Sequence, residues 1–222
     1  MPTRFDPHIE VLPAAQREIW PQLGPAANLG FVLYGGTAVA LHLGHRTSID
    51  FDFFKAEPLA KDKIVAAFAF MHNARTLQED KNTLVVDVTM RAGPVKLSFF
   101  GGLTLGRLND PVMTADNVLL VASLEDLLAT KLKAILDRAE AKDYRDIAAI
   151  ISAGTTLERS LGAFAKMYGT DPAIPLKALG FFKDGDLRSL PKVDQDLLRR
   201  ARDRVSRVPE VNLQRGLLPG QA

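Results

Sequence analysis

The sequence predicts an α+β protein, in which a small mixed β-sheet with flanking helices is followed by a helical C-terminal domain. Before residue 101, short apolar runs rich in Val, Leu and Phe are separated by glycine, proline and charged residues, as is typical of strands. After Ser123, apolar residues recur every three or four positions, as is typical of amphipathic helices. This change places a boundary near residues 105–122, and we expect an α/β domain over 1–110 and a helical domain over 111–222.

In the N-terminal half, β-type runs alternate with helical patterns. Gly35-Gly36 separates the first strand from an alanine-rich helix and predicts a tight turn there. We expect strands over Phe31–Tyr34, Ile49–Phe54, Leu84–Met90 and Val95–Phe100, and helices over Leu12–Ala27 with breaks at Pro21 and Pro25, Thr37–Leu43 and Leu59–Phe70.

The C-terminal half contains several helix-start signals. Ser123 is a suitable N-cap for the helix that follows, and Thr155 with Glu158 forms a capping-box pattern. We expect helices over Leu124–Arg138 and Ala141–Ile151, a helix after Thr155, and a late helix over Asp194–Val208.

Composition excludes several classes of protein. With 222 residues, 47% hydrophobic and 24% charged, and a net charge of +2, the chain can bury a core without metal or disulfide staples. It contains no cysteine, so disulfides, thiolate nucleophiles and cysteine-built zinc sites are excluded. No apolar run approaches the roughly 20 residues of a membrane-spanning helix, and Met1–Glu10 lacks the apolar region of a signal peptide. We expect a cytoplasmic protein that does not contact membranes.

Two aspartates shortly after the glycine pair carry the most chemical information. Asp50 and Asp52 are two positions apart in a predicted strand, so both carboxylates point to one face and repel each other unless a cation lies between them. Mg²⁺ prefers such oxygen ligands together with substrate phosphate. Gly35-Gly36 lets backbone approach a ligand, and the helix that begins at Thr37 offers free N–H groups to an anion. These parts together indicate a phosphate and metal site.

A simpler interpretation is available for the two aspartates. They would then be exposed residues on the polar face of an edge strand, a common arrangement in half-solvated sheets. The glycine pair close to them in the sequence favours the metal site, because an ordinary polar strand does not need that turn.

A lysine lies inside the apolar stripe of the predicted helix Leu124–Arg138. At about 100° per residue, Lys131 falls among the leucines, and Arg138 lies at the edge of the stripe. Lys131 either extends its ammonium group to water or directs it into a cleft toward a phosphate. Asp143, on the next helix, could pair with Lys131 or Arg138 or assist a metal.

These motifs resemble a known family. One group of residues resembles the first motif of the nucleotidyltransferase superfamily, and specifically that of its AbiEii/AbiGii toxin branch. The group comprises Gly35-Gly36-Thr37-Ala38, Leu43-Gly44-His45-Arg46, Ser48 and Asp50-Phe51-Asp52-Phe53-Phe54. The later motifs of that branch are similar to Lys131 to Arg138 and to Lys142-Asp143-Tyr144-Arg145-Asp146. The resemblance spans roughly residues 30 to 150.

The resemblance implies a nucleotidyltransferase fold and a mechanism. Asp50 and Asp52 would hold Mg²⁺ on a nucleoside triphosphate, and an acceptor group would attack the α-phosphorus and expel pyrophosphate. Lys131 and Asp143 would complete the catalytic set. The nucleotide-binding residues would be Gly35, Gly36, Thr37, Arg46, Ser48 and Arg138, with Arg46 and Ser48 supporting the two aspartates.

The chain departs from the superfamily pattern at one position. A third carboxylate is usual on a later strand, but Val95–Phe100 carries Ser98 at its centre. Asp87 is the nearby candidate for a third metal ligand, and it is equally compatible with the polar face of its strand. Asp143 could also take this role.

By analogy with the family, the expected function is transfer of a nucleoside monophosphate to an RNA, such as tRNA, or to a protein. The enzyme would be the toxin of a toxin–antitoxin or phage-defence pair, with a cognate antitoxin as partner. Two alternatives stay open: a nucleotide- or RNA-binding module that has lost catalysis, and an enzyme that modifies a small molecule such as an antibiotic.

Overall fold

The computed structural model describes residues 4–217 and divides the chain into two compact units. The first unit comprises the described residues up to Leu105, the segment Asp110–Ala122, and the described residues from Gly216 onward; the second comprises Gly106–Asn109 and Ser123–Arg215. This division differs from the predicted 1–110 and 111–222, because the segment Asp110–Ala122 contributes two strands to the N-terminal sheet.

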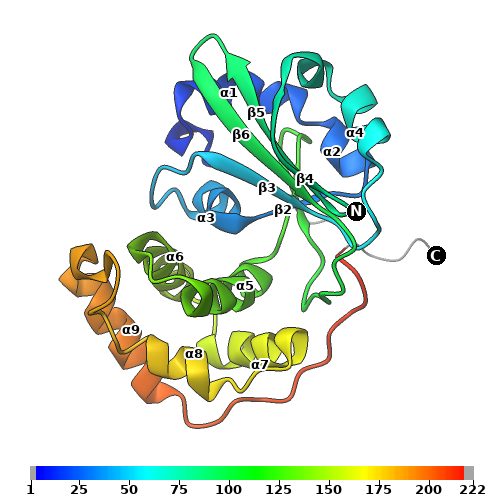
Figure 1. The fold of residues 1–222 in the computed structure, drawn as a ribbon. Coiled ribbons are helices and arrows are strands. Elements are labelled where there is room, and N and C mark those ends of the chain that lie inside the picture. Colours follow the sequence, from blue (N-terminus) through cyan, green and yellow to red (C-terminus); the bar gives the residue numbers. More distant parts are fainter. Residues whose placement is uncertain (1–3, 218–222) are drawn as a thin grey trace. The chain divides into compact units, whose positions relative to one another are not determined.

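The first unit contains one mixed sheet, which confirms the predicted α+β class (Figure 1). The order of strands across it is β1-β7-β8-β2-β3-β6-β5-β4. The strands are β1 (Arg4–Phe5), β2 (Val32–Tyr34), β3 (Asp50–Phe54), β4 (Arg75–Asp80), β5 (Thr83–Met90), β6 (Gly93–Phe100), β7 (Val112–Thr114) and β8 (Leu120–Val121). The four predicted strands are therefore confirmed to within two residues at each end as β2, β3, β5 and β6.

Strand β3 lies at the centre of this sheet, antiparallel to β2 and parallel to β6. Its side chains alternate between half-buried and fully buried, so Phe51 and Phe53 enter the core while the residues between them face the other way. The ring of Phe53 stacks on Phe99 of β6 with 5.2 Å between centroids, and Phe31 meets Phe99 edge to face at 5.3 Å. This aromatic layer fixes which face of β3 remains accessible.

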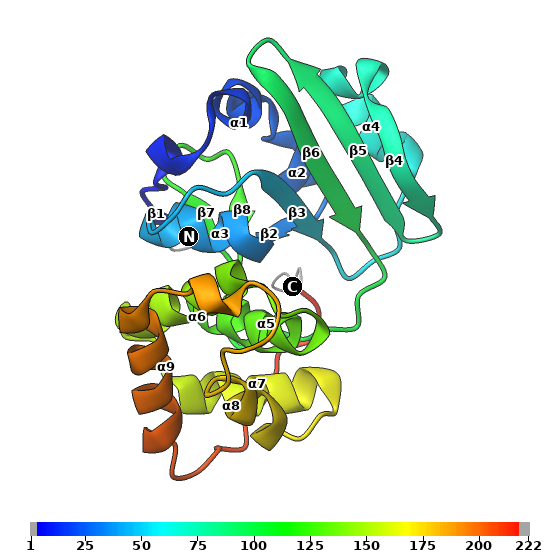
Figure 2. The same cartoon turned by 60° about the vertical axis from the view of Figure 1, so that its left-hand side comes forward.

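Short helices of the first unit connect the strands and lie beside the sheet (Figure 2). The helical segments are η1 (Ile9–Val11), α1 (Ala14–Ile19), η2 (Trp20–Gln22), α2 (Pro25–Asn28), α3 (Gly35–Leu43), α4 (Lys61–Ala67) and η3 (Ala69–Asn73). The helix predicted over Leu59–Phe70 is shorter than expected, because Phe68 takes an extended conformation and its buried ring packs 5.9 Å from that of Phe99.

The second unit is helical, as predicted. Helix α5 is central and packs against α6, α7 and α8, while α9 packs on α6. The segments are α5 (Leu124–Asp137), α6 (Ala141–Ser152), α7 (Leu157–Tyr168), α8 (Ala173–Ala178), η4 (Leu187–Ser189) and α9 (Lys192–Arg204).

The predicted caps have different outcomes. The Asp126 amide donates to the Ser123 hydroxyl oxygen over 3.1 Å, which confirms Ser123 as an N-cap. The prediction of a capping box at Thr155 and Glu158 is wrong. Helix α7 begins at Leu157, and its N-cap, Thr156, makes no side-chain capping bond. Over residues 4–217, the structure contains no helix with the length and apolar character needed to cross a bilayer.

Candidate active site

The two aspartates of β3 share the face opposite the phenylalanine core. Asp50 pairs in parallel register with Lys96 of β6, and Asp52 pairs with Ser98. Because partners in a parallel pair point to the same side, these four side chains form a polar patch on the face of the sheet opposite the phenylalanines. Both aspartates are half-buried, so their carboxylates are held by the strand and still reach solvent.

The glycine pair meets this patch directly. Gly35 has φ +75°, and a Cβ atom at this position would lie 2.4 Å from Oδ2 of Asp52. An L-residue would be strained there and would collide with the carboxylate, so only glycine suits both conditions. Helix α3 begins at Gly35 itself, without the separate turn that the sequence predicted, and its N-terminus therefore lies beside Asp52.

Gly36 lies against two further predicted residues. A Cβ atom there would lie 2.4 Å from Nη2 of Arg46 and 3.2 Å from Oγ of Ser48. Arg46 also donates from Nη1 to the Thr47 carbonyl over 2.9 Å. The backbone at the start of α3 is thus flanked by a guanidinium group on one side and by Asp52 on the other.

Thr37 and Ser48 support the start of β3 from inside. Both side chains are buried, their hydroxyl oxygens lie 2.9 Å apart, and the Thr37 hydroxyl also hydrogen-bonds the Asp50 carbonyl oxygen. These contacts fix the backbone of Asp50 relative to α3. The Thr37 and Ser48 side chains therefore position an aspartate, while the Thr37 N–H belongs to the first turn of the helix.

Lys96 lies between two carboxylates. Its Nζ is 3.3 Å from Oδ2 of Asp50, and its register partner on β5 is Asp87. Asp87 in turn accepts from Nη2 of Arg75 over 3.1 Å. Within the described part of the chain, no three carboxylate, imidazole or thiol side chains gather closely enough to bind a metal ion, so Asp87 forms no such group with Asp50 and Asp52.

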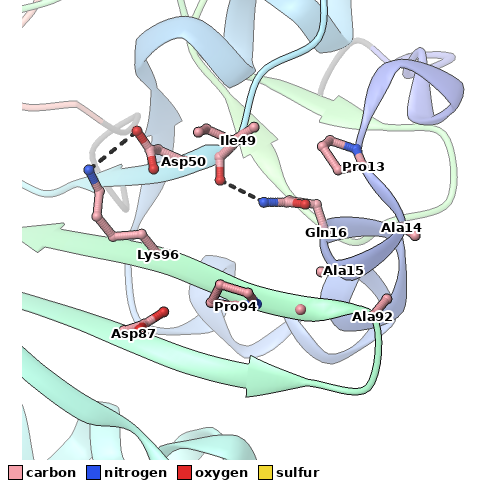
Figure 3. Close-up of a pocket in the computed structure, with 11 residues that line it drawn as sticks. Pro13, Ala14, Ala15, Gln16, Ile49, Asp50, Asp87, Ala92, Pro94 and Lys96 are labelled. Atoms are coloured by element: carbon pink, nitrogen blue, oxygen red, sulfur yellow. Dashed lines mark hydrogen bonds and ion pairs between the residues drawn. The ribbon is translucent and has the colours of Figure 1, made fainter.

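A cavity of about 340 Å³ opens beside Asp50 and is shown in Figure 3. It is lined by Gln16 of α1, by Ile49 and Asp50, and by Asp87 and Lys96 on the neighbouring strands. Gln16 donates from Nε2 to the Ile49 carbonyl over 2.7 Å. Neither Lys96 nor Gln16 was among the predicted site residues. The alternation of Val95–Phe100 could have identified Lys96, whereas no local sequence pattern points to Gln16.

The second unit contains a separate group of buried charges. Nζ of Lys131 lies 2.7 Å from Oδ1 of Asp143 and 2.6 Å from Oδ2 of Asp146, and both aspartate side chains are 0% exposed. Arg138 donates from Nε to Oδ2 of Asp143 over 2.8 Å, and its side chain is 48% exposed. Lys131 is therefore neutralised by two carboxylates and does not extend to water.

This arrangement sets the protonation of Asp143. Burial by itself would raise the pKa of its carboxyl group, but the hydrogen bond from Arg138 and the charge of Lys131 outweigh burial and lower the pKa below its ordinary value. Asp143 is therefore ionised at neutral pH. Asp146 was part of the later family motif but not one of the predicted site residues; it follows Asp143 by three residues on α6 and so reaches the same lysine.

Apart from Asp87, which pairs with Arg75, the predicted site residues thus form two clusters, one in each unit. The first contains Gly35, Gly36, Thr37, Arg46, Ser48, Asp50 and Asp52. The second contains Lys131, Arg138 and Asp143, joined by Asp146.

Two solved structures share this fold. A candidate nucleotidyltransferase from H. pylori is 16% identical, with a TM-score of 0.55 over 85% of this chain and 92% of that one. MenT4, the nucleotidyltransferase toxin Rv2826c from Mycobacterium tuberculosis H37Rv, is 14% identical, with a TM-score of 0.55 over 83% and 80% of the two chains. At these identities the similarity establishes the fold.

Sequence comparisons add the family. An uncharacterized protein from Aquifex aeolicus, aq_aa25, is 30% identical over 158 residues, which cover 69% of this chain and 74% of that protein. The family model described as nucleotidyl transferase AbiEii toxin, type IV TA system, matches residues 25–211 and so includes both clusters. The chain therefore belongs to the AbiEii family of nucleotidyltransferase toxins, and it is a nucleotidyltransferase.

Proposed function

We propose that this protein transfers a nucleoside monophosphate from a nucleoside triphosphate to an RNA or protein acceptor, with Mg²⁺ as cofactor. One observation carries the proposal: the Gly35 backbone at the start of α3 lies directly against the carboxylate of Asp52. A phosphate-binding helix N-terminus and a metal-binding carboxylate must lie this close together if one triphosphate is to contact both.

The start of α3 suits the β- and γ-phosphates. Its first N–H groups have no partner within the helix, and the helix dipole favours an anion at this end. Gly36 has no Cβ atom, and the guanidinium group of Arg46 lies close beside its backbone, where it would collide with a Cβ atom. A triphosphate bound here would meet positive charge from both the backbone and a side chain.

The donor set on β3 fits Mg²⁺. The ion is usually held by one or two carboxylates together with substrate phosphate, and Asp50 and Asp52 supply two carboxylates on one face. When bound, Mg²⁺ would neutralise phosphate charge during transfer. Thr37 and Ser48 hold Asp50 in place through its backbone, so the carboxylate is oriented before substrate binds.

The charge cluster of the second unit has a supporting role in this proposal. Asp143 orients Arg138, whose half-exposed guanidinium group suits a phosphate, and Lys131 neutralises the two buried aspartates. Lys131 and Asp143 would then contribute to catalysis by fixing the position of Arg138.

The family membership supports a toxin role. We propose that the protein acts in the cytoplasm as the toxin of a toxin–antitoxin or phage-defence pair, and that a cognate antitoxin suppresses it. Transfer to an essential RNA or protein would explain toxicity, since each turnover would modify and block one acceptor molecule.

The test is incubation with each α-labelled nucleoside triphosphate and cell extract, comparing wild type with Asp52→Ala. We expect Mg²⁺-dependent labelling of a macromolecule by wild type and a loss on the order of 10²-fold or more in the variant. Glu79→Gln, a change at an exposed carboxylate of β4, is the control and should label normally. Nuclease or protease treatment of the product identifies the acceptor class.

Two results would contradict the proposal. Equal labelling by wild type and Asp52→Ala would remove Asp52 from the mechanism. Nucleotide binding without any labelling under all conditions would instead favour a module that has lost catalysis.

A further inference from the structure

A row of alternating charges crosses the sheet and ends at Asp50. The strand register pairs Arg75 of β4 with Asp87 of β5, Asp87 with Lys96 of β6, and Lys96 with Asp50 of β3. Because register partners point to the same side of a sheet, the four side chains alternate in sign along one line. Lys96 therefore has a carboxylate on the strand to either side of it.

The ammonium group of Lys96 contacts one of these two carboxylates. Its Nζ lies 3.3 Å from Oδ2 of Asp50, and Figure 3 shows it turned toward that residue, with Asp87 on the next strand. The Asp87 side chain is 21% exposed and accepts from Nη2 of Arg75 over 3.1 Å. An ionised carboxylate has about four lone-pair sites, so Asp87 can accept from a second cation as well.

The second carboxylate is within reach of the same lysine. Strands β5 and β6 are antiparallel, and Asp87 lies directly opposite Lys96. Such partners have Cβ atoms roughly 4.5–5.5 Å apart, which is shorter than an extended lysine side chain. The flexible stem of Lys96 is partly exposed, so a change of rotamer can carry its Nζ from Asp50 to Asp87. That change does not require the strands to move.

The lysine and a metal ion compete for Asp50. A divalent cation on the two aspartates of β3 would lie beside the ammonium group of Lys96, and like charges at this separation repel each other. The contact between Lys96 and Asp50 is a half-exposed ion pair, which is weak and easily exchanged. Displacement of the lysine costs least where another carboxylate accepts it, and the register places Asp87 to do so.

We propose that Lys96 neutralises Asp50 until a divalent ion binds there, and that Asp87 then receives the lysine. This inference rests on the proposed function and deepens it, since it concerns a carboxylate to which we assign Mg²⁺. Asp87 is then a positioning residue, which raises the metal affinity of Asp50 by drawing Lys96 away. It does not serve as the third metal ligand, a role that the sequence left open for it.

Titration of the whole protein with Mn²⁺ tests the proposal without substrate. Mn²⁺ shares the oxygen ligands of Mg²⁺, and its unbound fraction is measured by EPR. We expect Lys96→Met to bind Mn²⁺ about three- to tenfold more tightly than wild type, because the competing cation is gone. Lys96→Arg keeps the charge and should remain close to wild type.

Removal of Asp87 should have the opposite effect. We expect Asp87→Asn to bind Mn²⁺ about threefold more weakly than wild type, because a lysine without a second partner stays on Asp50. Glu79→Gln is the matched control. It also removes one negative charge from this unit, but Glu79 pairs with Lys61 and not with Lys96, so Mn²⁺ binding should be unchanged.

The double variant separates a positioning role from direct ligation. If Asp87 acts through Lys96, Asp87→Asn should no longer weaken Mn²⁺ binding in the Lys96→Met background. A residue that held the ion itself, or attracted it only by charge, would give the same weakening in both backgrounds. Equal weakening would therefore overturn the proposal, and so would weaker Mn²⁺ binding by Lys96→Met alone.

A metal-free measurement tests the exchange independently of any ion. In protein with ¹⁵N-labelled lysine, the Nζ signal of Lys96 is assigned by its absence from Lys96→Met and reports which carboxylate the ammonium group contacts. Asp87→Asn should shift this signal little on its own and clearly more in the Asp50→Asn background, where the lysine turns to Asp87. Equal shifts in the two backgrounds would overturn the exchange.

The failures of the two proposals can be told apart. If wild type and Asp52→Ala bind Mn²⁺ equally, the metal site of the proposed function fails, and the Nζ signal still decides the exchange. If Mn²⁺ binding depends on Asp52 but Asp87→Asn acts equally with and without Lys96, the proposed function stands and this inference fails.

Discussion

The two charged clusters of this protein differ in how completely their charges are neutralised. In the first unit, Asp50 meets Lys96 at 3.3 Å, and the two side chains are 35% and 43% exposed. In the second unit, Lys131 binds Asp143 and Asp146 at 2.7 and 2.6 Å, with the lysine 6% exposed. Both are lysine–aspartate pairs, yet solvent reaches only one of them.

The difference shows what each cluster can do. A half-exposed pair is weak and easily exchanged, so Asp50 can give up its lysine for another cation. A buried cluster is held by the large cost of leaving any member unpaired, so it resists exchange and fixes geometry. The first cluster therefore suits ligand binding, and the second suits positioning.

Removal of the buried lysine tests this contrast with the largest expected effect. Lys131→Met removes the ammonium group that two buried carboxylates share, and we expect the free energy of unfolding to fall by about 3–5 kcal/mol. Urea denaturation measures the change. Lys133→Met, on the same helix and paired with Asp137 at the surface, is the control and should change little. Equal effects of the two changes would contradict the contrast.

The glycine next to Asp52 gives the next largest effect. Gly35→Ala adds a Cβ atom that collides with the Asp52 carboxylate at a residue with φ +75°, and we expect a loss of about 1–3 kcal/mol together with most of the transferase activity. Gly154→Ala is a matched control, because φ is +96° there and nothing lies within 4 Å of the added atom. It carries the backbone strain alone, so it should lower stability and leave activity unchanged. If the Gly35→Ala enzyme kept its activity, close packing of Gly35 against Asp52 would not be required for transfer.

The pH dependence of stability provides a smaller test. The pKa of Asp143 is lowered from its ordinary value of 3.8 in the folded state, so the unfolded state binds more protons as the pH falls below that value. The stability that this carboxylate contributes is complete above pH 3.8 and is lost as the pH falls through the lowered pKa. Denaturation at stepped pH should show the gap between wild type and Asp143→Asn narrowing in this range. A gap that widens on acidification would contradict the lowered pKa.

The exposed pair should give the smallest effect on stability. Lys96→Met removes the cation beside Asp50, and we expect the free energy of unfolding to change by at most about 1 kcal/mol, because both side chains remain partly in water. The same variant should increase the affinity of Asp50 and Asp52 for a divalent ion, as measured by calorimetric titration with Mg²⁺. A large loss of stability would show that this pair is structural, like its buried counterpart.

Several features of the fold were readable from local sequence. The alternation around Phe51 and Phe53 predicted β3 and its two faces, and Ser123 predicted the start of α5. Strand β4 was missed because all six of its residues are exposed, so its sequence carries no apolar alternation. Strands β7 and β8 are two or three residues long, and their pairing with distant strands, not their composition, makes them strands.

The candidate site was predicted in part for the same reason. Asp50, Asp52 and the glycine pair are close in sequence, so a strand and a turn were enough to propose that they converge. Lys131 was recognised as a cation on an apolar stripe and Asp143 as a candidate partner, and both are paired in the structure. Asp146 was not predicted as a site residue, because the sequence does not show how two helices must pack for both aspartates to reach one lysine.

The sequence by itself determined the family, the two-faced strand β3 and the residue types available for chemistry, since periodicity and motif spacing are properties of neighbouring residues. Only the tertiary structure decided which charges are buried and neutralised and which stay partly exposed. Lys96 meets Asp50, Lys131 meets Asp146, and Gln16 reaches Ile49, in each case between different elements of the chain. Burial and pairing depend on contacts between such distant elements, and these exist only once the chain has folded.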